Sequence, residues 1–118
     1  MVQLTQGTNT LYLNISNYND VLGGITPEYI IILTDESTNN TKTFTFDISI
    51  PDGGWNKRTL KGEIIINDTV TEDLDAGEIH LKQPRFLEGF YQMEIREYLA
   101  HNYTIVGKNL AYLERVSG

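Results

Sequence analysis

Residues 41–50 read TKTFTFDISI, and polar and apolar side chains alternate along this whole stretch. In an extended chain, successive side chains point to opposite faces, so Phe44, Phe46, Ile48 and Ile50 would share one side. A period of two with β-branched and aromatic residues is typical of a half-buried strand. We therefore predict one continuous strand over 41–50 whose apolar side faces the core.

The same rhythm extends to both sides of this stretch. Residues 28–34 form a short apolar run before Asp35, which predicts a strand covered on both faces. The polar residues 35–40 predict a hairpin turn between this strand and 41–50. Gly107 predicts a bulge or bend in the last strand. Further strands are predicted over 11–15, 62–67, 78–81, 89–98 and 103–115, with at most one short helix in 69–76 or 83–88.

Seven or eight short strands separated by turn residues indicate an all-β chain, arranged as a single antiparallel β-sandwich or barrel. The length of 118 residues corresponds to one domain spanning 1–118. Residues 1–9 form an N-terminal arm in this interpretation. The arm could pair within its own domain or reach across to another subunit.

Composition excludes several kinds of function. The chain has no cysteine, which rules out disulfides, thiolate metal sites and cysteine nucleophiles. Its formal net charge of -7 disfavours binding to nucleic acid and to anionic membrane surfaces. The start of the chain lacks the basic and apolar regions of a signal peptide, and its longest apolar run covers only 30–33. We expect a soluble protein made in the cytoplasm of its host cell.

Catalytic chemistry has few candidate residues. The two histidines, His80 and His101, would both have to join carboxylates to form a metal site. No serine lies in a nucleophile elbow and no glycine-rich phosphate loop is present. We therefore predict no enzyme activity, no cofactor and no metal site. Calcium binding by the acidic residues of 68–78 stays open, although their spacing fails the EF-hand pattern and favours a solvated turn.

Protein contacts are a better use for the remaining residues. Trp55 lies in a glycine-rich loop beside Lys57 and Arg58, a combination that can anchor an interface. The alternative is a Trp55 side chain that folds back over an open end of the sandwich. Val2 and Leu4 of the N-terminal arm complete the candidate interface, because open edges of a small sandwich can accept a strand from a neighbour.

Four segments resemble small virion proteins of crAss-like and related tailed bacteriophages of Bacteroidetes. They are NTLYLN at 9–14, YIIILT at 29–34, GFYQMEIRE at 89–97 and IVGKNLAY at 105–112. The last two segments are the more specific ones, and Trp55 lies outside the shared pattern. The resemblance implies an immunoglobulin-like sandwich located on the virion, as an auxiliary capsid protein, a decoration protein or a head-fibre component. It provides no functional residues to transfer.

Three hypotheses follow. The first is a non-enzymatic virion structural protein, present in many copies or as an oligomer, that binds the major capsid protein or another virion protein. The second is a ligand- or carbohydrate-binding module of a fibre or surface system, which exposed aromatic side chains would favour. The third is an accessory domain of an enzyme, which would require a larger partner chain.

Overall fold

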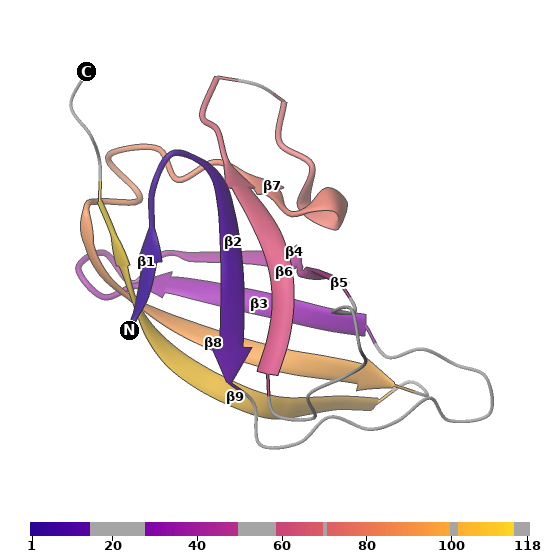
Figure 1. The fold of residues 1–118 in the computed structure, drawn as a ribbon. Helices are drawn as coiled ribbons and strands as arrows, with labels where there is room; N and C mark the ends of the chain where they lie inside the picture. The colour runs from indigo at the N-terminus through magenta and orange to yellow at the C-terminus, as the bar shows by residue number, and fades with distance from the viewer. Residues whose placement is uncertain (15–27, 50–58, 70, 100–101, 115–118) are drawn as a thin grey trace.

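The computed structural model consists almost entirely of strands, and it describes residues 1–14, 28–49, 59–69, 71–99 and 102–114. Nine strands and one 3₁₀ turn lie within these ranges, and Figure 1 shows how they are arranged. The elements are β1 (Val2–Leu4), β2 (Gly7–Asn14), β3 (Glu28–Asp35), β4 (Thr41–Thr45), β5 (Asp47–Ser49), β6 (Thr59–Ile66), η1 (Leu74–Ala76), β7 (Glu78–Ile79), β8 (Gly89–Leu99) and β9 (Asn102–Leu113).

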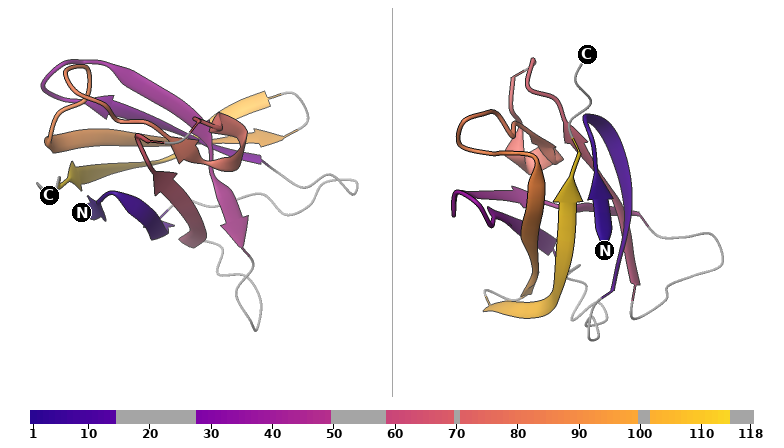
Figure 2. Two further views of the ribbon diagram at one scale, coloured as in Figure 1. Left: turned by 90° about the horizontal axis from the view of Figure 1, so that it is seen from above. Right: turned by 90° about the vertical axis from the view of Figure 1, so that its left-hand side faces the viewer.

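The strands form two sheets that face each other. One sheet has five strands in the order β1-β9-β8-β3-β4, and the other has the order β2-β6-β5, with β7 added beside β6. Figure 2 shows β2, β6 and β5 as a second layer below the five-stranded sheet. Most pairs are antiparallel, whereas β1 runs parallel to β9 and β7 runs parallel to β6. The prediction of an antiparallel, almost wholly β chain is therefore confirmed at the level of two packed sheets.

Apolar side chains from both sheets meet between the layers. The longest strands, β8 and β9, pair with each other, and β3 pairs along the other side of β8. Ile31 lies opposite Phe44 in the β3–β4 hairpin and opposite Ile95 in the β3–β8 pair, which puts three buried side chains on one row. The other sheet contributes Leu11 and Leu13 from β2. The remaining core residues are Leu4, Tyr29, Leu33, Phe46, Ile64, Ile66, Ile79, Leu81, Phe86, Tyr91, Met93, Val106, Ala111 and Leu113.

The prediction of one strand over 41–50 is wrong. The chain leaves the five-stranded sheet after Thr45 and enters the other sheet at Asp47, so β4 and β5 belong to different layers. Phe46 lies between them, and its backbone N–H donates to the Tyr29 carbonyl at 2.8 Å. Phe44 and Phe46 are both buried, as the alternation predicts. The break has a physical reason, since a chain that turns the corner of a sandwich can keep its apolar side inward while it changes its hydrogen-bonding partner.

The expectation that 28–34 is covered on both faces is also wrong. Tyr29, Ile31 and Leu33 are buried, but Ile30 and Ile32 lie half-exposed on the outer face of the sheet. In contrast, the bulge predicted at Gly107 is confirmed. Ile95 pairs with Gly107 and the next residue of β8 pairs with Ile105, so that Val106 is the extra residue of β9.

Two further expectations change in detail. The N-terminal arm pairs within its own domain, with Leu4 opposite Leu113, and β2 already begins at Gly7. The short helix expected in 69–76 is the single 3₁₀ turn η1, which Asp73 caps by accepting a hydrogen bond from the backbone of Ala76. The hairpin turn at 35–40 is confirmed, with Asn39 at a φ of 60°.

Candidate functional site

The outer face of the five-stranded sheet collects the half-exposed side chains that the core does not use. Because side chains alternate along a strand, the residues between the buried positions of β3, β8 and β9 all point to this face. Strand register places them in rows, with Gln92 between Thr34 and Leu110, and Glu94 between Ile32 and Lys108. We call this surface the outer face; its central residues are Ile32, Thr34, Phe90, Gln92, Glu94, Lys108, Leu110 and Tyr112.

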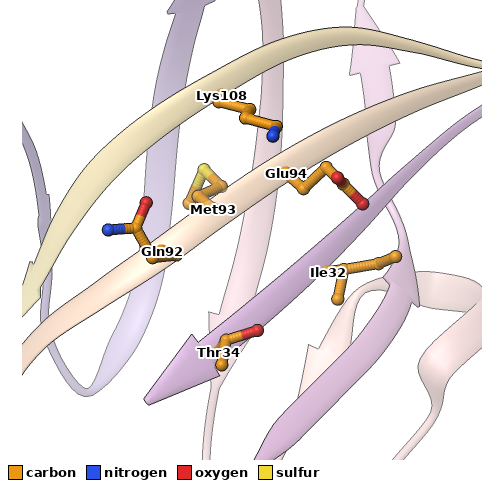
Figure 3. A pocket seen from close by; sticks show the side chains of 6 residues that line it. All are labelled: Ile32, Thr34, Gln92, Met93, Glu94 and Lys108. Carbon is orange, nitrogen blue, oxygen red and sulfur yellow. The ribbon is translucent and has the colours of Figure 1, made fainter. Parts of the chain in front are cut away.

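A shallow hollow of about 210 Å³ lies across these rows. Figure 3 shows side chains from β3, β8 and β9 around it, with Gln92 and Glu94 leaning in opposite directions along β8. Gln92 is held by a hydrogen bond from its amide to the carboxylate of Glu36. Glu94 is held by Arg96, whose Nε lies 2.8 Å from a carboxylate oxygen. The two contacts separate the neighbouring side chains and leave the hollow between them.

Four charged side chains lie around the hollow and balance one another. Glu36 and Glu94 supply two negative charges, while Arg96 and Lys108 supply two positive ones. Because the whole chain carries -7, this face is less acidic than the rest of the molecule. A negatively charged partner would meet less repulsion here than elsewhere on the surface.

An aromatic patch adjoins the hollow. Phe90 and Tyr112 lie directly opposite each other on β8 and β9, with ring centroids 5.1 Å apart in an edge-to-face arrangement. Leu110 lies two residues before Tyr112 on the same face. Phe90 is 45% exposed and Leu110 is 41% exposed. We call these three residues the aromatic patch; neighbouring exposed apolar side chains on a sheet face are a candidate contact surface.

The structure locates only part of the predicted interface. Trp55, Lys57 and Arg58 lie outside the described residues. Leu4 is 1% exposed and belongs to the core, and its strand pairs with β9 of the same chain, so an interface at Val2 and Leu4 stays a prediction. Val2 is half-buried and packs against the same core.

The acidic segment serves the loop in which it lies. Asp68 accepts a hydrogen bond from the backbone N–H of Leu81 at 2.9 Å. Glu72 accepts from the backbone N–H of His80 at 2.7 Å and from Lys42 at 2.8 Å. Burial alone raises the pKa of Glu72, but hydrogen bonds from Lys42 and His80 hold the pKa below its ordinary value. These carboxylates therefore fix the path of 68–81 across the molecule.

Metal-ligating groups do not gather in the part of the chain that the structure describes. No set of three or more histidine, aspartate or glutamate side chains there could hold an ion. His101, one of the two histidines considered for a metal site, lies outside the described residues. Calcium binding at 68–78 has no support from this arrangement, since Asp68, Glu72 and Asp73 each accept a different backbone hydrogen bond.

Two buried acidic residues, which the sequence analysis did not single out, accept hydrogen bonds inside the fold. Asp35 is 1% exposed and accepts hydrogen bonds at 2.7 Å from the backbone N–H groups of Ser37 and Leu87. Glu97, also 1% exposed, accepts from the hydroxyl of Tyr29 at 2.8 Å. Both acids occupy inward positions of a strand, and that place in the alternating pattern was the available signal.

Comparison with known proteins provides no relative. No protein-family model matches the chain, and neither a curated protein nor a solved structure does so. Among the residues described, no helix is long and apolar enough to cross a membrane. The residues and their geometry therefore carry the functional argument.

Proposed function

We propose that this chain is a non-enzymatic virion structural protein with an immunoglobulin-like fold, which binds the major capsid protein or a neighbouring virion component through the aromatic patch. The strand order supports the fold. If β2 is taken as strand B of an immunoglobulin domain, the sheet β2-β6-β5 corresponds to strands B, E and D. The other sheet then contains strands G, F, C and C′ in the order β9-β8-β3-β4.

Tyr91 supports the same assignment. Immunoglobulin-like domains carry a tyrosine near the start of strand F whose hydroxyl bonds to the backbone a few residues upstream. Tyr91 is the third residue of β8, and its hydroxyl donates to the Leu87 carbonyl at 2.8 Å. In antibody domains a disulfide cysteine follows two residues later. Here that position is Met93, which is buried, so apolar packing takes the place of the disulfide.

The observation that carries the functional proposal is the concentration of exposed apolar side chains on one face. Phe90, Leu110 and Ile105 all lie on the outer face of β8 and β9, although water surrounds about half of each side chain. Aromatic residues at a contact surface supply a large apolar area with few rotatable bonds. The balanced charges of Glu36, Glu94, Arg96 and Lys108 would form the polar rim of such an interface.

The virion as the location rests on the resemblance of 89–97 and 105–112 to phage virion proteins. These two segments form most of β8 and β9, which are the strands that carry the aromatic patch. The family resemblance and the exposed apolar surface therefore fall on the same part of the molecule. If many copies lie on a particle, each copy would bind one neighbouring virion protein through this face.

Particle composition and one double variant test the proposal together. We expect mass spectrometry of purified particles to find the chain in stoichiometric amounts relative to a virion protein. We expect Phe90→Ser with Leu110→Ser to lower incorporation while the thermal unfolding of the isolated chain stays close to that of the parent. Thr41→Ser with Thr43→Ser is the matched control, because both positions are exposed on β4 of the same sheet. Absence of the chain from particles would reject the proposal.

A carbohydrate-binding module is the second candidate, and the hollow beside the aromatic patch favours it. Sugar rings stack on aromatic side chains, while hydroxyl groups bond to amides and carboxylates such as those of Gln92 and Glu94. A glycan array with the parent chain and Gln92→Ala distinguishes the two functions. A specific sugar signal that Gln92→Ala removes would support the module, and a flat array would leave the structural role.

A further inference from the structure

The edges of the two sheets differ in how they are protected. In the described part of the chain, β4 ends the five-stranded sheet on one side, and the segment around η1 packs against it. A Cβ at Gly77 would lie 3.2 Å from the Thr45 carbonyl oxygen, which shows how closely this segment approaches β4. On the other side, β1 has only three residues, and Lys108 and the bulge at Val106 interrupt the exposed part of β9. Short strands, bulges, charges and covering loops are the usual means of preventing edge-to-edge pairing.

Within the ranges that the structure describes, strand β2 has none of these protections. It is eight residues long and ends the second sheet, and among the described residues only β6 pairs with it, although β9 of the other sheet also approaches it. Its sequence GTNTLYLN contains no charge and no proline. Thr8, Thr10 and Tyr12 point outward and are exposed, with Tyr12 at 63%. An uncharged strand of this length and composition is a template for a further strand.

The turn before β2 is held by its own hydrogen bonds, which favours pairing of β1 within its own domain over its exchange between subunits. Asn9 is buried and accepts a hydrogen bond from the Thr5 backbone N–H at 3.0 Å. Its amide nitrogen donates to the carbonyl groups of Thr5 at 2.8 Å and Gly7 at 3.1 Å. Because these contacts hold β1 and β2 in one conformation, the pairing surface is the preformed edge of β2 itself.

We propose that β2 pairs antiparallel with β2 of a second copy of this chain, so that the two smaller sheets join into one continuous sheet. The occupant follows from charge. Lys61 lies opposite Tyr12 in the β2–β6 pair, with Nζ 5.8 Å from the ring centroid, and Glu63 lies opposite Thr10. A two-fold axis at Leu11 puts Tyr12 opposite Thr10 of the second copy. The row across the joined sheet then has Lys61 of one copy at one end and Glu63 of the other copy at the other end, with Tyr12 and Thr10 between them.

Neighbouring registers are less favourable. Residues that lie opposite each other in an antiparallel pair point to the same face of the sheet. Because side chains alternate along each strand, the two-fold axis must lie where two copies of the same residue face each other, not midway between two successive residues. An axis at Thr10 would place Glu63 of both copies on one row, and an axis at Tyr12 would do the same with Lys61. Only the axis at Leu11, among these three, pairs unlike charges. This complementarity favours a second copy, in the register with the axis at Leu11, over an unrelated strand.

The absence of cysteine allows a direct test with the full chain. Thr10→Cys and Tyr12→Cys are made separately at exposed positions, then mixed and oxidised. Opposite positions of an antiparallel pair bring Cβ atoms close enough for a disulfide after small adjustments. We expect the mixture to yield more cross-linked dimer than either variant alone. Thr43→Cys, exposed on the covered edge strand β4, is the matched control, and light scattering of the parent chain gives its mass in solution.

The expected result is a parent chain that dimerises with rising concentration, together with preferential cross-linking between positions 10 and 12. A parent chain that stays monomeric throughout would overturn the proposal. Equal cross-linking by the mixture, by either single variant or by the Thr43→Cys control would also overturn it. The test uses purified chain without particles, so its outcome is independent of the virion role and of the aromatic patch.

Discussion

Asp35 offers the sharpest test of how the fold is held together. Its side chain is buried at the end of β3 and accepts two short hydrogen bonds, from the backbone N–H groups of Ser37 and Leu87. The first contact shapes the β3–β4 turn, and the second attaches the loop before β8. Substitution Asp35→Asn keeps the size of the side chain but replaces one accepting oxygen by a donating NH₂ group, which then faces an N–H.

The expected cost follows from these two contacts. A hydrogen bond to a charged group contributes about 1.5–3 kcal/mol, and a buried donor left without an acceptor costs about 1–3 kcal/mol. Asn at this position can replace one contact, but it loses the other and leaves its NH₂ group facing an N–H, so the two costs together lower the free energy of unfolding by about 2.5–6 kcal/mol. Urea titration at neutral pH measures this change. Asp75→Asn is the control, because Asp75 is exposed and surface changes stay within about 0.5 kcal/mol.

The pH dependence gives a second measurement on the same variant. Burial alone raises the pKa of Asp35, but hydrogen bonds from Leu87 and Ser37, with help from Thr38 and Tyr91, bring the pKa below its ordinary value of 3.8. The unfolded chain therefore binds a proton more readily than the folded one. The stabilisation from Asp35 is complete above the unfolded pKa and is lost as the pH falls through the folded pKa.

Asp35→Asn should therefore reduce the acid sensitivity of folding below about pH 4, while Glu72 still contributes its own share. An Asp35→Asn variant with the stability and acid sensitivity of the parent would refute the assignment of Asp35 as an anchor of both loops. A loss of stability at neutral pH with unchanged acid sensitivity would refute the role of its charge.

Three further substitutions test other parts of the fold. Phe46→Ala should lower the free energy of unfolding by about 3–5 kcal/mol, since a buried ring is removed at the corner between the sheets, and thermal melts measure this loss. Asn9→Ala should cost about 1–3 kcal/mol in urea titration, because its side chain holds the turn between β1 and β2 and the Thr5 N–H loses its acceptor. Gly77→Ala should cost about 1–3 kcal/mol in the same assay, as φ is 72° there and the added methyl group would crowd the Thr45 carbonyl; an unchanged stability would show that the loop yields.

Much of the fold could be predicted from the two-residue alternation alone. The pattern identified 28–34, 62–67, 89–98 and most of 103–115 as strands, because burial on one face leaves a trace in the sequence. Gly107 also indicated the bulge correctly. The division of 41–50 could not be predicted, since Phe44 and Phe46 point inward on either side of the corner. A strand that changes sheets keeps its alternation while its partners change, and partners are set by tertiary structure.

The proposed contact surface was harder to predict than the fold. The sequence analysis favoured Trp55 because a tryptophan in a glycine-rich loop stands out, whereas the aromatic patch lies within regular strands. The sequence feature that could have indicated the aromatic patch was the adjacent pair Phe90-Tyr91. Adjacent aromatic residues in a strand must point to opposite faces, so one of them faces the solvent. Tyr91 is buried and Phe90 is exposed. Strand β8 therefore has an aromatic side chain on its outer face as well as one in the core.

The acidic residues explain why the sheet edges at β4 and β2 differ in how they are covered. Asp68 and Glu72 bond to the backbone of 80–81, and Glu72 also binds Lys42 of β4, so these carboxylates attach the covering segment to one sheet edge. Closing that edge leaves β2 as the long edge strand that has neither a charge nor a cover among the described residues. The other edge of its sheet is β5, which has only three residues, so strand pairing is concentrated at β2. Restriction to one edge favours closed pairs over open-ended stacking, because each copy then has one strand to offer.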